Sequence, residues 1–196
     1  MSNAVVGRYD SGAVGCGRNE ADIVARIADQ VESRIANDPN FPVTVTRSPE
    51  CSSYCGGKHK ASSHLSYTVR YLNEHQIIAG GRPADFILSL HMNSSENAEA
   101  SGTEVYYSKA AVRGGARWHQ AVRVAIAVSS TLGIPNRGIF RSDDSQHSSL
   151  AILDSTKAPA LLIELGFITN GRDVKAVEEC GADAVIAAIT AILRPR

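Results

Sequence analysis

The segment ADFILSLHMNSS, residues 84–95, decides the fold more than any other stretch of this 196-residue chain. It is apolar from Phe86 to Leu90, as expected for a buried strand, and it then carries His91 and Asn93. In α/β proteins, ligands bind at the carboxyl ends of such strands. His91 is therefore either a hydrogen-bonded core histidine or a site residue, and the rest of the chain has to decide between the two.

Amphipathic helices alternate with β-type runs on both sides of this strand. The spacing of apolar residues predicts helices over residues 19–37, 63–78, 116–133 and 173–193. Further strands are predicted at VTVTR (43–47), GTEVYYS (102–108), LAILD (150–154) and ALLIELGF (160–167), with a long polar loop at NRGIFRSDDSQHSS (136–149). This order predicts an α/β fold, a three-layer sandwich with a mostly parallel central sheet and helices on both faces.

Composition and charge restrict the class of protein. The chain is 43% hydrophobic and 20% charged, which is typical of a globular domain. Its 20 Lys and Arg balance its 20 Asp and Glu, which argues against nucleic acid or an anionic membrane as partner. No apolar run is long enough for a membrane span, and the N-terminus lacks the features of a signal peptide. We expect a single domain over residues 1–196, acting as a monomer.

Two cysteines share a loop with two histidines in CSSYCGGKHKASSH, residues 51–64. Cys51, Cys55, His59 and His64 could in principle hold zinc. A zinc finger, however, separates its two ligand pairs by roughly a dozen residues, and only three residues lie between Cys55 and His59. We therefore expect a flexible polar loop there, and a disulfide between the two cysteines is left open.

Glu164 interrupts the apolar run APALLIELGF, which has the composition of a central strand buried on both faces. A buried carboxylate has to be neutralised, paired or bound to a metal. Burial also raises a carboxyl pKa toward neutrality, which suits a general base. Glu164 is thus either a catalytic residue or one half of a buried ion pair.

Glu20 begins the first predicted helix and follows the glycine-rich turn DSGAVGCGRNE. Taken alone it is a first-turn acid that favours the helix dipole. Together with His91 it could hold Zn²⁺ with positions open for water and substrate. Glu164 would then deprotonate that water.

The order of DSGAVG, NEAD, VTVTR, LSYTVRYLN, ADFILSLHMNSS, GTEVYYS, NRGI and LAILDSTKAPALLIELGFITN resembles the zinc-dependent N-acetylmuramoyl-L-alanine amidases of the Amidase_3 type. The resemblance covers nearly the whole chain, and SLHMNS and LLIELGFITN are its most specific pieces. It implies a Zn²⁺-dependent hydrolase of peptidoglycan, found in autolysins and phage endolysins, that cuts the amide bond between N-acetylmuramic acid and L-alanine. It assigns Glu20 and His91 to the metal and Glu164 to catalysis, and it implies action on the cell wall by a secreted protein or a phage lysin.

One feature departs from this pattern. The family opens with a strand that ends in Gly-His a few residues before the Asp of DSGAVG, but Val5 and Val6 stand there and no histidine precedes His59. Three explanations compete. We favour a native chain that begins further upstream, so that the first strand is missing. Alternatively, His147 supplies the third ligand, or the site is degenerate and the protein is a peptidoglycan-binding or regulatory module without activity.

Overall fold

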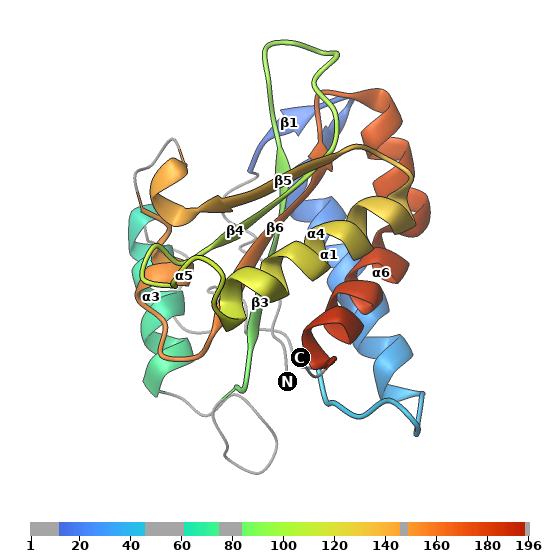
Figure 1. Ribbon diagram of the computed structural model, residues 1–196. Coiled ribbons are helices and arrows are strands. Elements are labelled where there is room, and N and C mark those ends of the chain that lie inside the picture. Colours follow the sequence, from blue (N-terminus) through green and yellow to red (C-terminus); the bar gives the residue numbers. More distant parts are fainter. Residues whose placement is uncertain (1–11, 46–60, 75–83, 146–148, 195–196) are drawn as a thin grey trace.

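A computed structural model describes residues 12–45, 61–74, 84–145 and 149–194 (Figure 1). In chain order its elements are the short strands β1 (Val14–Gly15) and β2 (Arg18–Asn19), the helices α1 (Glu20–Ala36) and α3 (Ala61–Glu74), the strands β3 (Ile87–Asn93) and β4 (Thr103–Tyr107), helix α4 (Ala116–Leu132), strand β5 (Asn136–Arg141), the 3-10 helix η1 (Ser142–Asp144), helix α5 (Ala151–Asp154), strand β6 (Ala160–Phe167) and helix α6 (Gly171–Leu193). None of the described helices has the length and apolar character that crossing a bilayer requires.

The central sheet has the strand order β3-β6-β4-β5 in the described part of the chain. The pairs β3–β6 and β4–β5 are parallel, whereas β4 and β6 are antiparallel. The sheet is therefore mixed. β1 and β2 form a separate two-stranded hairpin that leads directly into α1.

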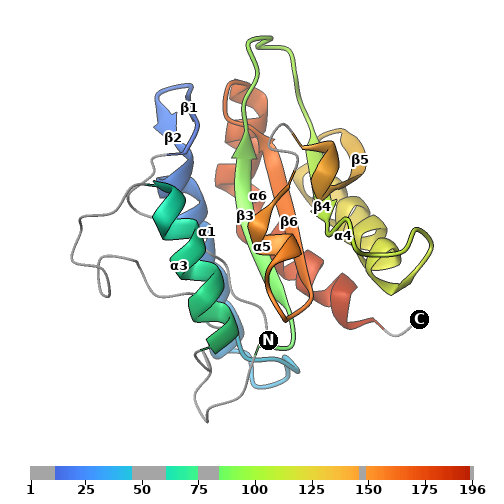
Figure 2. The same ribbon diagram turned by 90° about the vertical axis from the view of Figure 1, so that its left-hand side faces the viewer.

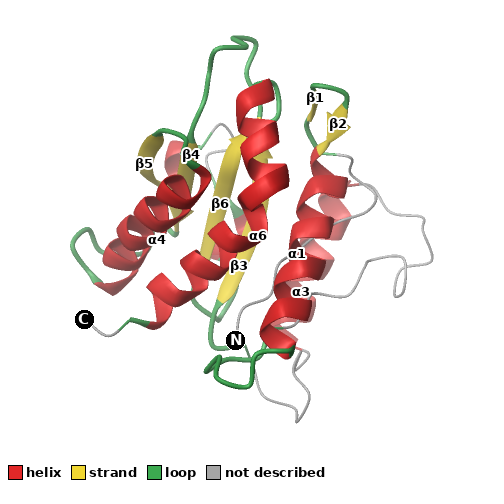
Figure 3. Ribbon diagram, turned by 90° about the vertical axis from the view of Figure 1, so that its right-hand side faces the viewer, coloured by secondary structure: helices red, strands yellow, loops and turns green. Residues whose placement is uncertain are grey.

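Helices cover both faces of this sheet, as the sequence predicts. One hydrophobic cluster joins α1, α4 and α6 to one face, and Figure 3 shows α4 and α6 in front of the strands and α1 beside β3. A smaller cluster joins α3 and α5 to the other face, which is turned toward the viewer in Figure 2. The alternation within β6 explains the layering, because Leu161 and Ile163 belong to the first cluster and Leu162 belongs to the second. The α/β sandwich predicted from the sequence is confirmed.

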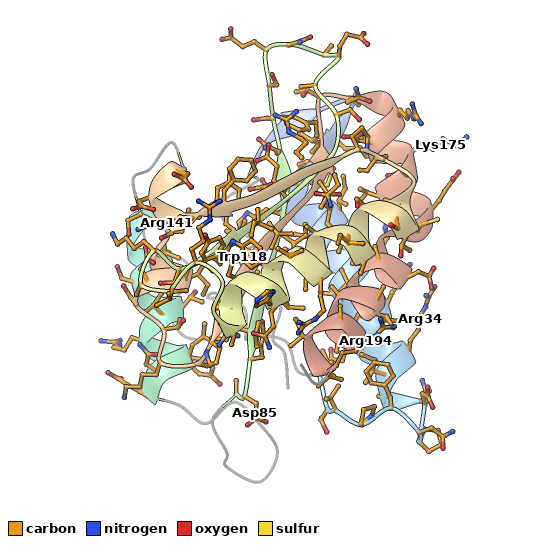
Figure 4. All side chains as sticks on the ribbon, in the orientation of Figure 1. Arg34, Asp85, Trp118, Arg141, Lys175 and Arg194 are labelled. Atoms are coloured by element: carbon orange, nitrogen blue, oxygen red, sulfur yellow. The ribbon has the colours of Figure 1, made fainter. Side chains whose placement is uncertain are left out.

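The long helices begin and end close to where the sequence predicts. Asn19 caps α1 by accepting a hydrogen bond from the Asp22 backbone N–H at 2.8 Å. Gly133 ends α4 in the left-handed conformation, with φ of 64°. An ion pair of 2.7 Å between Arg34, labelled in Figure 4, and Asp183 joins the surfaces of α1 and α6.

The prediction of a polar loop over residues 136–149 is wrong for its first part. Asn136–Arg141 forms β5, which pairs with β4 at the edge of the sheet, and Ser142–Asp144 forms η1. An edge strand is solvated along one side and carries exposed polar side chains, so it lacks the apolar pattern of a central strand. Gly138, with φ of 107°, adds a turn signal inside the strand.

Two predicted strands are also wrong. LAILD contains the short helix α5, whose Ile152 and Leu153 pack in the cluster around α3. Short apolar runs do not distinguish helix from strand by periodicity. In VTVTR, residues 43–45 form no strand, and Val43 and Val45 pack instead as partly buried side chains against the core. The remaining residues, 46 and 47, lie outside the described residues, as do positions 75–78 of the second predicted helix.

Candidate active site

Two of the predicted site residues lie side by side on the central strands. In the parallel pair β3–β6, His91 is the register partner of Glu164. Register partners on neighbouring strands point to the same face, and here that face is the one covered by α3 and α5. We expect from the sequence that His91 and Glu164 lie at the carboxyl ends of neighbouring strands. The strands are neighbours and the two residues share a face, but β3 continues to Asn93 and β6 to Phe167, so both residues precede the last residues of their strands.

Glu20 reaches the same place from the amino terminus of α1. Its Oε1 lies 2.8 Å from Nδ1 of His91 and accepts a hydrogen bond from the Met92 backbone N–H at 3.1 Å. Its Oε2 accepts from the Ala13 backbone N–H at 2.9 Å, in the turn that precedes the hairpin. Gly12, with φ of 63°, allows this turn to lie close to the Glu20 side chain, since a Cβ at Gly12 would collide with the Glu20 carboxylate. The glycine-rich turn therefore fixes the position of Glu20.

The Glu20–His91 pair favours the charged form of each partner. Burial alone would raise the pKa of Glu20, but hydrogen bonds from His91, Ala13 and Met92 and the charge of His91 outweigh it, so the pKa lies below its ordinary value. Burial alone would lower the pKa of His91, but the hydrogen bond to Glu20 and the charges of Glu164 and Glu20 raise it. The side chain of His91 is 38% exposed and that of Glu20 is 13% exposed.

Glu164 differs from Glu20 in its hydrogen bonding and in the direction of its pKa shift. Its Oε2 is buried and has no hydrogen-bond partner in the described structure. Burial raises the pKa of Glu164 to about 7; the charge of His91 works against this rise, and those of Glu20 and Glu104 add to it. Among the described residues, Oε2 of Glu164 has no Arg or Lys partner, so a buried ion pair at this oxygen is not seen. A buried carboxyl that changes charge near neutral pH can both accept and donate a proton.

The donor atoms of Glu20 and His91 suit a zinc ion. They supply one oxygen and one nitrogen, which are common zinc donors. Two ligands of a tetrahedral zinc ion lie about 3.3 Å apart, so the observed 2.8 Å pair would open only slightly around a metal. Ser89 contacts the other ring nitrogen of His91, with 3.0 Å between Oγ and Nε2, and such a partner orients a metal-ligating histidine.

Glu20 and His91 thus fit two of the three protein ligands of a hydrolytic zinc site. Within residues 12–45, 61–74, 84–145 and 149–194, no group of three or more His, Cys, Asp and Glu side chains is arranged to hold a metal ion. The candidate third ligand His147 lies outside the described residues, as do Cys51, Cys55 and His59 and the side chain of His64.

The sequence does not reveal the ion pair that Glu104, the neighbour of Glu164, forms with Arg137. Glu104, on β4, is the antiparallel register partner of Glu164 and is only 5% exposed. Its Oε1 lies 2.6 Å from Nε of Arg137, on β5. An acidic residue inside the predicted strand GTEVYYS was the available signal for Glu104. Arg137 was hidden because its strand was taken for a loop.

Comparisons with known proteins show what the chain is similar to. The model of the family Amidase_3, described as N-acetylmuramoyl-L-alanine amidase, matches residues 5–193. Among curated proteins, the chain is 25% identical over 173 residues to the N-acetylmuramoyl-L-alanine amidase LytC of Bacillus subtilis, covering 88% of this chain. The alignment spans only 30% of the length of LytC.

Solved structures show the same fold. The CwlD amidase from Clostridioides difficile, solved in complex with the GerS lipoprotein, has a TM-score of 0.74 at 18% identity, with 98% of each chain covered. The catalytic domain of an endolysin that targets Clostridia Difficile has a TM-score of 0.70 at 22% identity, with 98% of this chain and 97% of the other covered.

Proposed function

The chain belongs to the Amidase_3 family of N-acetylmuramoyl-L-alanine amidases, and from that premise we propose that it hydrolyses the amide bond between N-acetylmuramic acid and L-alanine in peptidoglycan. The observation that carries the proposal is the convergence of Glu20, His91 and Glu164. These residues come from α1, β3 and β6 and meet at one place on the sheet. The family and the names of its relatives favour the enzyme over a degenerate wall-binding module.

We propose Glu20 and His91 as ligands of the Zn²⁺ on which this family generally depends. A zinc ion held there would polarise the scissile carbonyl and lower the pKa of a water molecule. Glu20 is suited to this role because the backbone N–H groups of Ala13 and Met92 hold its carboxylate in place. Ser89 fixes the ring of His91 from its other side.

Glu164 is the proposed general base and acid. As a carboxylate it takes a proton from the attacking water, whose oxygen forms a bond to the lactyl carbonyl carbon. It then gives this proton to the nitrogen of L-alanine as the carbon–nitrogen bond breaks, so that a carboxylic acid and a free amine result. A pKa of about 7 suits both transfers near neutral pH. The unbonded Oε2 leaves one oxygen available for the proton.

The peptidoglycan substrate locates the action of the protein at the cell wall, in keeping with the cell-wall amidases among its relatives. We propose that residues 1–196 act there as a single catalytic domain and as a monomer. A secreted autolysin and a phage lysin would both encounter peptidoglycan at the cell wall.

The experiment that tests this function is the digestion of purified peptidoglycan by zinc-supplemented protein. New amino termini and new reducing sugar ends are measured together. We expect amino-terminal L-alanine to appear without new reducing ends. Binding without any new terminus would indicate the degenerate module, and new termini on other residues would indicate an endopeptidase. Either result would contradict the proposal.

A further inference from the structure

The row of side chains that contains His91 and Glu164 continues onto the next strand, β4. Glu164 pairs in register with Glu104 on β4, and Glu104 pairs with Gly138 on β5. His91, Glu164 and Glu104 therefore share one face of the sheet, and neighbouring strands in such a row are about 4.8 Å apart. A second acidic residue lies next to the proposed catalytic one, in a part of the site to which the proposed reaction assigns no role.

Glu104 is fully bonded within this row. Its Oε1 lies 2.6 Å from Nε of Arg137. Its Oε2 accepts hydrogen bonds from Nδ2 of Asn93 at 3.1 Å and from the hydroxyl of Tyr106 at 3.0 Å. A buried carboxylate that accepts hydrogen bonds from three donors is held in a fixed position. Its structural effect is to hold one nitrogen of Arg137 in a set position.

Arg137 is held at a second point and remains accessible. Its guanidinium lies over the ring of Phe167, with 5.0 Å to the ring centroid, and its side chain is 42% exposed. Among the described residues, the only hydrogen bond of this guanidinium is the one from Nε to Glu104. The two terminal nitrogens, Nη1 and Nη2, are therefore free on the described structure. They form the planar fork that matches a carboxylate with two parallel hydrogen bonds.

We propose that Arg137 is a substrate-binding residue that takes a carboxylate of the stem peptide in its terminal fork. This inference rests on the proposed function. In that substrate the lactyl carboxyl is consumed in the scissile amide, so the carboxylates near this bond belong to the peptide half. Among the described residues, the terminal nitrogens of Arg137 are donors without a partner, and a carboxylate of the peptide half is the group of this substrate that fits their planar fork. Arg137 thus marks the side of the site on which the peptide lies.

A purely structural role for Arg137 predicts a different result. If Arg137 only neutralises Glu104, lysine at this position would replace its charge, and any loss would be the same for charged and uncharged substrates. If the fork binds a carboxylate, lysine keeps the charge but loses the two parallel hydrogen bonds. The loss would then fall on the charged substrate alone.

The test compares N-acetylmuramoyl-L-alanyl-D-glutamate with its diamide, in which both glutamate carboxyls are uncharged. Binding is measured with Glu164→Gln protein, with and without Arg137→Lys, and cleavage is measured with Glu164 intact and zinc present. Arg137→Lys should weaken binding of the dicarboxylate about 10- to 100-fold, the range for hydrogen bonds to a charged group. It should change binding of the diamide less than about threefold, and it should raise KM more than it lowers kcat.

Arg141→Lys is the matched control, since Arg141 is an exposed arginine on the same strand and pairs with Asp143. This variant should change the binding of neither the dicarboxylate nor the diamide. Equal weakening of both ligands by Arg137→Lys, or a wild-type protein that binds both equally, would overturn the inference. Should the wild type cleave neither peptide while its binding of the dicarboxylate still depends on Arg137, the inference would stand and the proposed hydrolysis would fail.

Discussion

At the scale of single residues, the site contains three carboxylates that differ in their hydrogen-bond and ion-pair partners. Glu20 accepts hydrogen bonds from two backbone N–H groups and contacts His91. Glu104 is ion-paired with Arg137. Only Glu164 has a buried oxygen without a partner, and burial raises its pKa to about 7. The same functional group therefore serves as a proposed metal ligand, as an anchor and as a proposed proton carrier.

Gly12 allows a residue-scale test of how Glu20 is positioned. Gly12→Ala places a methyl group against the Glu20 side chain, whose Cβ and Cδ lie 2.8 Å from the modified position. Gly17→Ala is the control, because Gly17 has a similar φ of 70° and open space around it. Both variants should lose about 1–2 kcal/mol of stability from the left-handed backbone. Only Gly12→Ala should also lose zinc affinity and hydrolysis. Equal activity of the two variants in the peptidoglycan assay would contradict the assigned position of Glu20.

The raised pKa of Glu164 predicts how stability depends on pH in zinc-free protein. The protonated carboxyl is favoured in the folded state, so its contribution is full below about pH 4.5 and is lost as the pH rises through about 7. The wild type should therefore lose about 3 kcal/mol relative to Glu164→Gln between about pH 4.5 and about pH 8. Denaturant unfolding of both proteins measures this difference. A stability difference that does not change with pH would show that Glu164 is not perturbed.

At the scale of secondary-structure elements, the amino terminus of α6 holds the strand ends beside the site together. Asp173 is fully buried. Its carboxylate accepts hydrogen bonds from Ser101 Oγ at 2.6 Å, from the Gly102 N–H at 2.8 Å and from the Phe167 N–H at 2.9 Å. These contacts tie the start of β4 and the end of β6 to one helix. The register that aligns Glu104 with Glu164 depends on both strands.

Asp173→Asn should therefore destabilise the fold. An amide can accept with only one oxygen, so at least one buried donor loses its partner or faces another donor. The expected loss is about 1–3 kcal/mol in the free energy of unfolding. Asp183→Asn on the same helix removes only a surface ion pair with Arg34, and it should cost less than about 1 kcal/mol. Similar losses for the two variants in thermal or urea unfolding would contradict the role given to Asp173.

The elements that the sequence predicts correctly are those whose burial pattern is strong. The helices α1, α4 and α6 have apolar stripes and clear end signals, and β6 is apolar except for Glu164. β5 was missed because hydrogen bonds to β4, and not burial, define an edge strand. The pairing of Glu104 with Arg137 could not be predicted for the same reason, since it depends on the register between two strands. Glu164 was found because a charge inside an apolar run is a local signal.

At the scale of the whole molecule, the site is assembled from both layers that cover the sheet. His91, Glu164 and Glu104 are on the face covered by α3 and α5, whereas Glu20 belongs to α1, which packs on the opposite face. Glu20 bridges the two faces of the sheet at β3, where it contacts His91 and the Met92 N–H. Residues separated by 144 positions, Glu20 and Glu164 (164 − 20), are thus brought to the same place only when the complete sandwich is folded.

The role of Glu164 is tested by the rate at which Glu164→Gln protein releases amino-terminal L-alanine from peptidoglycan, with zinc content measured on the same sample. We expect zinc content equal to that of the wild type and a rate lower by about 10²- to 10⁴-fold. Glu179→Gln, an exposed substitution on α6, should leave the rate unchanged. A Glu164→Gln protein that releases L-alanine at the wild-type rate would contradict the assignment of Glu164 as the general base.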